Sequence, residues 1–541
     1  MRSRSGVYLV GKDMTMSGGG RRPWPVSLAC PEASHAGRSV RPPILSTGAA
    51  CGSRLCCGVS WIKFDARRGP RTLLLKCREN PQVPGVSKRV SRTLGVYPPL
   101  GLAYIAAYLR QNGYSVGILD ANAWNLDAPQ LGCAIREFQP DVVGLTSMTI
   151  EWHNAVAAAR IVKAVKPDTL VVVGGPQLSA YPQECLSFDA FDVGVIGDGE
   201  RTMLEIVERV GSHSAPAGLP GTVWRESGGV RIGPPGSSVE RLDDLPFPAV
   251  DLLPLERYRA LTVSRPFLTM VSSRGCPFHC HFCSQVYTGN GVRLRSAENI
   301  VAEMEHYVRT YDPREIIMFD ETFTLDRARI LRLCELMREK GFRFRWNIRT
   351  RVDCVDEEML RALKSAGCYS LHMGVESGSP EILQKMNKGI TIEQAEAAFR
   401  TARKLGFIVR GYFMTGYLGE TLQTYRKTVE FAKKLDLDWV SFTTTVPLPK
   451  SALYDEALRA GVLAYDYWRE FTLMRVKEDI PHFTTPQYDY RHLKALTRRA
   501  YWEFYLRPRF IIRKLRSVTS LEHFLELCRG ARVLLHIPEL F

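Results

Sequence analysis

The chain has 541 residues, 24% of them charged and 45% hydrophobic, which is the composition of a soluble globular protein with room for about three domains. No run approaches eighteen apolar residues, and the N-terminus has no continuous apolar segment. Neither a membrane-spanning helix nor a secretory signal is therefore expected. Fourteen cysteines without such a signal favour the reducing cytoplasm over a disulfide framework.

The formal net charge of +16 is concentrated in two segments. Residues 1–70 hold 11 Lys and Arg against 3 Asp and Glu, and residues 491–516 hold 9 against 1. The rest of the chain is neutral by count, so we do not expect a nucleic-acid partner.

Residues 1–70 are rich in Gly, Arg, Pro and Ser and have no sustained periodicity, which predicts a disordered basic extension. A targeting peptide is the alternative, because the segment is rich in Arg and poor in acidic residues. Its Gly and Pro residues interrupt the amphipathic helix that a targeting peptide would form.

Residues 71–212 alternate continuous apolar runs with helical patterns, which indicates a buried parallel sheet. Five such runs predict a flavodoxin-like (Rossmann-like) α/β domain. Ligands of these sheets bind beyond the carboxyl ends of the strands. Small and polar residues stand at those ends, and we take them as candidate ligand contacts, although turn formation alone also favours them: Thr146, Ser147, Gly174, Gly175, Gly197, Gly199 and Glu200.

Residues 213–266 are predicted to form a linker that contains a hairpin over 221–232, with a Ser-Gly-Gly turn. From residue 267 to 455 a longer βα alternation predicts six strands and a partial (β/α)6 TIM-type barrel. Active sites of such barrels form at the carboxyl ends of the strands, where polar residues gather in this sequence.

Cys276, Cys280 and Cys283 stand at C-x3-C-x2-C spacing directly after the first predicted barrel strand. Three thiolates on one tight loop can hold three irons of a [4Fe–4S] cluster and leave the fourth iron open. A zinc site that takes His279 or His281 as its fourth ligand is the alternative. The other barrel cysteines stand singly on apolar patterns and are expected to be buried small hydrophobes.

The cysteine spacing, with Phe282 before the third cysteine, resembles the radical S-adenosylmethionine (SAM) superfamily. The preceding domain is similar, in YPPLGL (97–102), VVVGGP (171–176) and VIGDGE (195–200), to the cobalamin-binding domain found before the radical SAM barrel in one large branch. That branch includes the anaerobic magnesium-protoporphyrin monomethyl ester cyclase and cobalamin-dependent methylases. A degenerate domain that no longer binds cobalamin is the alternative.

The resemblance implies a [4Fe–4S] cluster, SAM and cobalamin as cofactors. Because the chain lacks the Asp-x-His-x-x-Gly loop, cobalamin is expected base-off and without a protein His ligand. SAM needs partners for its amino, carboxylate and ribose groups. For these and for its adenine we assign residues that match the family's positions, although a helix cap or surface ion pair explains a single acidic residue equally: Phe282, Asp320, Glu321, Arg351, Glu376 and Gly416.

The reaction implied by the resemblance is reductive cleavage of SAM to a 5′-deoxyadenosyl radical, hydrogen abstraction from an unactivated carbon, and methyl transfer from methylcobalamin. A radical cyclase that uses cobalamin differently or not at all is one alternative, and a non-catalytic cobalamin or metal sensor is another. Electrons would come from a flavodoxin or ferredoxin. No motif identifies the substrate, which we expect to be a small molecule.

Residues 456–541 are predicted to be helical and to lie outside the barrel. Basic and aromatic residues interleave over 498–516, which suits contact with anionic lipid or a pocket for a lipophilic substrate. A docked helix with snorkelling arginines explains the same pattern, and we favour it. A cytoplasmic protein, peripheral to the membrane at most, is the corresponding localisation.

Overall fold

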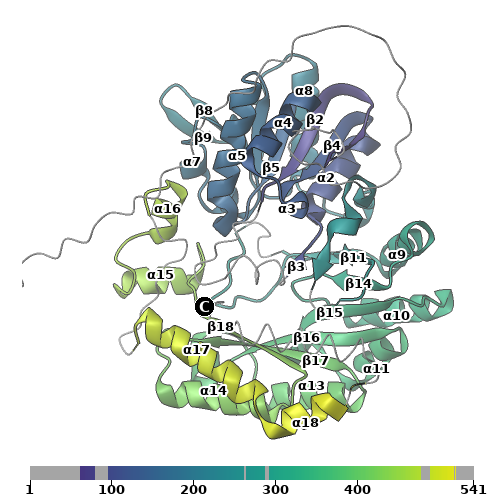
Figure 1. The fold of residues 1–541 in the computed structure, drawn as a ribbon, viewed down its shortest axis with the longest axis vertical. Coiled ribbons are helices and arrows are strands. Elements are labelled where there is room, and N and C mark those ends of the chain that lie inside the picture. The colour runs from purple at the N-terminus through teal and green to yellow at the C-terminus, as the bar shows by residue number, and fades with distance from the viewer. Residues whose placement is uncertain are drawn as a thin grey trace, which may run out of the picture. The chain divides into compact units, whose positions relative to one another are not determined.

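The computed structural model describes residues 61–78, 95–260, 263–286, 291–476, 488–516 and 518. Predictions for residues 1–60 and for the chain after 518 lie outside these ranges. Two sheets organise the described residues, and each is covered by helices (Figure 1). An α/β domain followed by a six-stranded parallel barrel was predicted, and the structure confirms this fold class.

The first sheet has eight strands, and its five central strands are parallel. In sheet order these are β4 (Tyr114–Asp120), β2 (Arg68–Lys76), β5 (Val142–Thr146), β6 (Leu170–Gly174) and β7 (Val193–Val195). Counted along the chain, the order is 2-1-3-4-5, the flavodoxin-like order. The order reverses between β2 and β5, so the ligand site is expected beyond their carboxyl ends.

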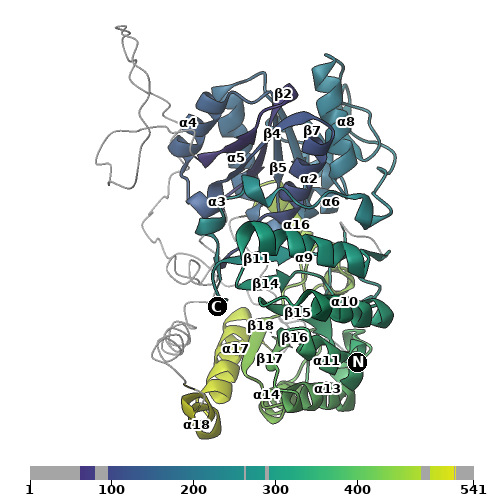
Figure 2. The ribbon, with the colours of Figure 1, turned by 90° about the vertical axis from the view of Figure 1, so that its right-hand side faces the viewer.

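Alternate residues of these strands belong to different cores, as the period of two requires. Val142 faces one core with the helices α2 (Leu100–Gln111) and α8 (Glu200–Gly211). Val143 faces the other core, with α4 (Ala128–Phe138) and α5 (Trp152–Val165). Figure 2 shows α4 and α8 on opposite sides of this sheet.

Antiparallel strands extend both edges of the first sheet, and here the structure corrects two predictions. β1 (Lys63–Asp65) pairs with β4, and β2 begins at Arg68, so strand structure starts within the predicted disordered extension. The predicted hairpin is β8 (Thr222–Glu226) and β9 (Gly229–Ile232), but β8 pairs with β7 and belongs to the sheet. Pairing at the edges satisfies backbone groups that would otherwise be exposed.

The second sheet contains six parallel strands in chain order. They are β11 (Phe267–Met270), β14 (Glu315–Met318), β15 (Arg345–Arg351), β16 (Cys368–Glu376), β17 (Ile408–Thr415) and β18 (Trp439–Thr444). The connecting helices lie along the outer side (Figure 1): α9 (Ala297–Tyr311), α10 (Arg327–Lys340), α11 (Glu357–Ser365), α13 (Ile392–Lys404) and α14 (Leu422–Lys434).

Helix α17 (Tyr490–Tyr505) docks against β18, the last barrel strand. The hydroxyl of Tyr505 accepts the backbone N–H of Val440 at 3.0 Å, and that of Tyr501 accepts the N–H of Phe442 at 3.1 Å. The tyrosines thus satisfy edge groups of β18 that would otherwise lack partners. For residues 498–505, which belong to α17, the structure confirms the docked helix that we favoured.

Two shorter helices, α15 (Ala452–Arg459) and α16 (Tyr467–Thr472), follow the barrel and pack into the core of the first sheet. Trp152 of α5 donates its indole N–H to the Thr472 oxygen at 2.8 Å. No helix among the described residues has the length and apolar character needed to cross a membrane.

Candidate active site

The three cysteines lie on a loop that starts at the carboxyl side of β11. A short strand, β12 (Ser273–Arg274), pairs with β13 (Arg293–Leu294) and leads into the loop. Gly275 has φ +91°, and a Cβ there would collide with the backbone oxygen of Gly291. Only glycine fits this turn, which explains the Gly directly before Cys276.

Backbone hydrogen bonds hold the loop against two distant segments. His281 donates its N–H to the Met386 oxygen at 2.9 Å, and its own oxygen accepts the N–H of Leu453 at 2.8 Å. Asn387 donates its side-chain amide to the His279 oxygen at 2.9 Å. The histidines of the motif therefore anchor the loop through their backbones.

Across the part of the chain that the structure describes, no three His, Cys, Asp or Glu side chains converge as the ligands of one metal ion must. The thiols still lie within electrostatic range: desolvation, then Cys280 and Cys276, raise the pKa of Cys283 to about 11. This relation suits ligands of separate irons in one cluster.

Positive charge surrounds Cys280. The guanidinium of Arg351 lies 3.5 Å from the Cys280 Sγ, and it donates to both Asp353 carboxylate oxygens at 2.9 Å each. Desolvation raises the pKa of the Cys280 thiol, and Lys388 and Arg351 oppose the rise. We assigned Arg351 to SAM. Its side-chain donors have partners within the protein, and its charge favours a thiolate at Cys280.

Glu376 ends β16 in a strained conformation, with φ +74°. Its carboxylate accepts from the Lys388 Nζ at 3.0 Å in a buried ion pair. A bulge between Gly374 and Glu376 turns the strand end at this point. Backbone strain of this kind is typical of functional sites, and it accords with the predicted SAM-binding role of Glu376.

Phe282 packs beside Met414 and Leu418 against a small apolar cluster that includes Tyr417. This surface suits a flat aromatic ligand such as adenine. Gly416, another residue assigned to SAM, has φ +77°, and a Cβ there would lie 2.7 Å from Leu493 of α17. Packing of α17 alone is thus sufficient to explain a glycine at 416.

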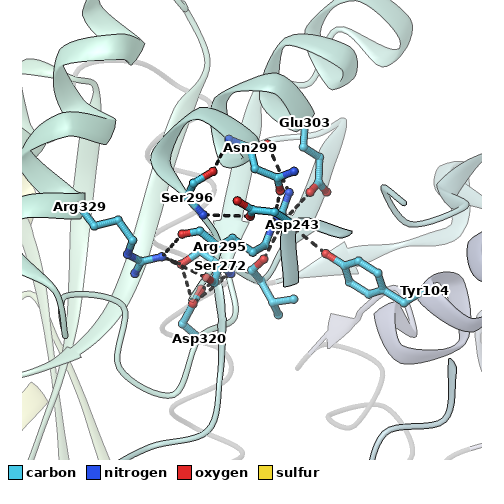
Figure 3. Close-up of polar contacts among 10 residues, drawn as sticks. Tyr104, Asp243, Ser272, Arg295, Ser296, Asn299, Glu303, Asp320 and Arg329 are labelled. Atoms are coloured by element: carbon cyan, nitrogen blue, oxygen red, sulfur yellow. Dashed lines mark hydrogen bonds and ion pairs between the residues drawn. The ribbon is translucent and has the colours of Figure 1, made fainter. Parts of the chain in front are cut away.

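The carboxylate of Asp320 is buried and committed within the protein (Figure 3). It accepts the backbone N–H of Ser272 at 3.0 Å, the Ser272 hydroxyl at 2.7 Å and the Ser273 hydroxyl at 2.5 Å. Arg329 donates to the Ser272 oxygen at 3.0 Å. Asp320, which we assigned to SAM, therefore fixes the segment that leads to Cys276. Glu321 is exposed, and its pKa is raised by desolvation and by Asp320.

The carboxyl ends of β5 and β6 bring four predicted cobalamin contacts together. Gly175 has φ +95°, and a Cβ there would lie 2.9 Å from both the Ser147 oxygen and the Thr146 hydroxyl. Ser147 accepts the N–H of Gln177 and donates its own N–H to Gly174. Directly after Ser147, Met148 and Ile150 are half exposed, and such an apolar surface fits the broad face of a corrin.

The three residues predicted as cobalamin contacts at the end of β7 lie in different surroundings. Gly197 has φ +79° and open space around it, which suits ligand approach, whereas Gly199 faces Ile105 of α2. Glu200 is buried and pairs with Arg274 at 2.6 Å. Its carboxylate is thus paired with the segment that leads into the cysteine loop.

Sequence reasoning missed three cations that the structure brings to these sites. Arg274 also pairs with Asp198 at 3.1 Å, Lys388 pairs with Glu376, and Lys76 pairs with Glu151 at 2.6 Å at the end of β2. Arg274 stands next to the Gly-Cys turn, which was an available signal. Nothing in the local sequence marks Lys388 or Lys76.

The fold and the loop define a class of protein: a (β/α)6 barrel with a three-cysteine cluster loop, preceded by a cobalamin-binding type of domain. The sequence pattern of the radical SAM superfamily matches residues 270–432, and that of the B12 binding domain matches residues 87–207. The chain belongs to the radical SAM superfamily, in the branch with a B12 binding domain, and it is an enzyme.

Known proteins agree with this assignment. The chain is 36% identical to the uncharacterized methyltransferase PH0819 of Pyrococcus horikoshii, over 80% of this chain and 93% of that protein. It is 30% identical to the anaerobic magnesium-protoporphyrin IX monomethyl ester cyclase of Rubrivivax gelatinosus, over 67% and 66%. The cobalamin-dependent SAM radical enzyme OxsB shares the fold, with a TM-score of 0.68, 18% identity, and coverage of 87% and 72%.

Family membership implies a [4Fe–4S] cluster, SAM and cobalamin, and the residues present fit these groups. Cys276, Cys280 and Cys283 would hold the cluster, and the edge at Thr146 and Gly175 would receive cobalamin. His153, which follows β5, stacks on Phe471 with centroids 4.2 Å apart and contacts the Phe471 oxygen at 2.9 Å, so its ring is already engaged. A cobalamin without a protein His ligand remains our prediction.

Proposed function

We propose that the enzyme transfers a methyl group from SAM to an unactivated carbon of a small molecule. Bound cluster, SAM and cobalamin would supply the radical and methyl-transfer chemistry. The chain's own residues hold the cysteine loop, place cations beside Cys280, and present the polar strand ends of the barrel to the substrate.

One observation carries this proposal: the two cofactor regions are joined by ion pairs. Arg274, two residues before Cys276, pairs with Asp198 and Glu200 at the carboxyl end of β7. Arg293 of β13 pairs with Asp198 at 2.7 Å. An enzyme that uses cobalamin and the cluster on one substrate needs the two sites held together, because positioning supplies much of its rate.

The experiment measures whether the methyl group of SAM is transferred to a product. Anaerobically reconstituted protein with cobalamin and a reductant is incubated with methyl-deuterated SAM and a small-molecule extract of the source cells, and products are analysed by mass spectrometry. We expect a product that carries the deuterated methyl group. Formation of 5′-deoxyadenosine with unlabelled, altered products would instead indicate a radical cyclisation.

We further propose a cytoplasmic enzyme that receives electrons from a flavodoxin or ferredoxin and touches membranes through α18 (Pro508–Arg516), where it would meet a lipophilic substrate. Ile511, Ile512 and Leu515 are exposed on this basic helix, while Phe510 points inward. Such a face suits anionic lipid. Co-sedimentation with phosphatidylglycerol vesicles should be lost in I512D/L515D, and equal binding by the variant would contradict the proposal.

A further inference from the structure

Two arginines stand in one row across the barrel sheet. Arg349 of β15 lies opposite His372 of β16, and His372 lies opposite Arg410 of β17. Trp439 of β18 continues the row. Residues that pair across neighbouring strands point to the same face, so the guanidinium groups flank the histidine on one face of the sheet.

This face is the inner one, away from the helices. The residue before each member of the row points to the opposite face of the sheet. These residues, Ile348, Leu371 and Val409, belong to the apolar core shared with the outer helices. Arg349 and Arg410 are each half-buried. The row therefore lines the interior of the barrel.

Both arginines contact aromatic rings. The guanidinium carbon of Arg349 lies 4.3 Å from the Phe319 ring centre, and that of Arg410 lies 5.9 Å from the Trp439 ring centre. Neither Arg349 nor Arg410 forms an ion pair or side-chain hydrogen bond with a carboxylate of the residues that the structure describes. An arginine stays charged in proteins, and a half-buried cation without an anion is costly.

Glu315, a buried carboxylate of the barrel sheet, is hydrogen-bonded to other groups. Glu315 accepts from Tyr369 at 2.7 Å, from Asn347 at 2.8 Å and from the Ser264 N–H at 2.9 Å. These three bonds use both carboxylate oxygens. Glu315 lies on the level of Arg345, four residues before Arg349 on β15, so it does not neutralise the row.

His372, which lies between the two arginines, is a neutral hydrogen-bonding group. His372 Nδ1 lies 3.0 Å from the Tyr412 hydroxyl, and desolvation, then Arg410 and Arg349, hold the pKa of His372 well below its ordinary value. The imidazole is therefore neutral and able to donate or accept one further hydrogen bond. Arg349, Arg410 and the neutral imidazole of His372 thus form a polar surface inside the barrel.

The row of Arg349, His372 and Arg410 lies close to the cysteine loop along the strand direction. Arg351, which contacts Cys280, is two residues after Arg349 on the same strand. At the rise of a strand, two residues correspond to about 7 Å. A molecule held by the row would extend toward the cysteine loop, with Phe319 and Tyr97, whose ring centres are 5.2 Å apart, beside it.

We propose that Arg349 and Arg410 bind a carboxylate or phosphoryl group of the substrate. His372 and Tyr412 complete the anion site, and Tyr97, Phe319 and Trp439 contact the apolar part. This inference rests on the proposed function, because it takes the barrel interior as the substrate site. The substrate class is an anionic molecule with a non-polar portion directed toward the cluster.

The test uses the full chain, reconstituted with its cluster, and two anions as probes: inorganic phosphate and succinate, titrated by calorimetry at constant ionic strength. Wild type should bind at least one of them. R349Q and R410Q should weaken that binding tenfold or more, and R349K less, since lysine keeps the charge but loses the fork of donors. R345Q is the matched control, because Arg345 is exposed on the same strand. Its guanidinium carbon lies 3.8 Å from the centre of the Tyr369 ring.

Binding that is equal in wild type, R349Q and R410Q, or absent in wild type with both probes, would overturn the anion site. Thermal unfolding of each variant verifies that it is folded, and R349K provides a charge-preserving variant if R349Q is not. Cleavage of SAM to 5′-deoxyadenosine is measured in the same samples without substrate. Loss of that cleavage in wild type with anion binding intact would instead count against the proposed function.

Discussion

At the scale of single residues, the buried partners of the cysteine loop decide whether a cluster can be held. Asp320 and Arg329 both bind the Ser272 segment, and Arg351 and Lys388 place charge beside Cys280. Chemistry at the three cysteines thus depends on side chains that are far away in the sequence.

Replacing Asp320 by Asn should destabilise the protein by about 1–3 kcal/mol, because the buried serine donors lose charged acceptor oxygens. Iron content after reconstitution should fall in parallel, since the segment before Cys276 loosens. Denaturant unfolding and iron analysis measure both effects. E321Q is the control, because Glu321 is exposed and adjacent; an equal loss in the control would show that the Asp320 network is irrelevant.

Glu420 predicts a dependence of stability on pH. Its carboxylate is 1% exposed and accepts the Gly416 N–H at 2.5 Å, and burial raises its pKa from 4.5 to about 7. Because the folded state holds this proton more tightly, the contribution is full below pH 4.5 and declines by about 3 kcal/mol as pH rises to 7.

The variant E420Q should remove that decline. Its midpoint of thermal unfolding should exceed that of wild type at pH 8 and match it at pH 5. Scans of both proteins across this range provide the measurement. Parallel curves at every pH would show that Glu420 keeps an ordinary pKa.

At the scale of elements, the turn from β7 into α8 is tied to β12. Arg274 and Glu200 are both largely buried, so loss of one partner leaves the other charge without compensation. A double-mutant cycle of R274Q and E200Q should give a coupling of about 2 kcal/mol. The exposed pair Arg332–Glu298 is the control and should give less than about 1 kcal/mol. If the changes in the free energy of unfolding caused by R274Q and E200Q were additive, the ion pair would not couple the two segments.

Hydrophobic patterning was sufficient to predict the elements but not their polar partners. The six barrel strands and the five strands of the flavodoxin-like domain were predicted from apolar runs that end in polar turns, as at Thr146 and Asp320. The edge strand β1 and the attachment of β8 were missed because short edge strands carry little pattern. The partners of Asp320, Arg351 and Glu200 depend on tertiary packing, which spacing in one chain does not encode.

At the scale of the whole molecule, the cysteine loop contacts both the B12 binding domain and the barrel strands. Ion pairs join the base of the loop to the first sheet, and cations flank its second cysteine. In the barrel interior, Arg349 and Arg410 have no carboxylate partner among the residues that the structure describes. The arrangement accords with a radical SAM enzyme of the branch that has a B12 binding domain.

We expect Cys276, Cys280 and Cys283 to hold a cluster that cleaves SAM. The most direct measurement is 5′-deoxyadenosine formed by anaerobically reconstituted protein with SAM and dithionite, together with the visible absorption of the cluster. Wild type and C133A, which alters a buried cysteine of α4, should show both signals, and C276A, C280A and C283A should show neither. Cleavage that persists in the three variants, or that is absent from reconstituted wild type, would contradict the account.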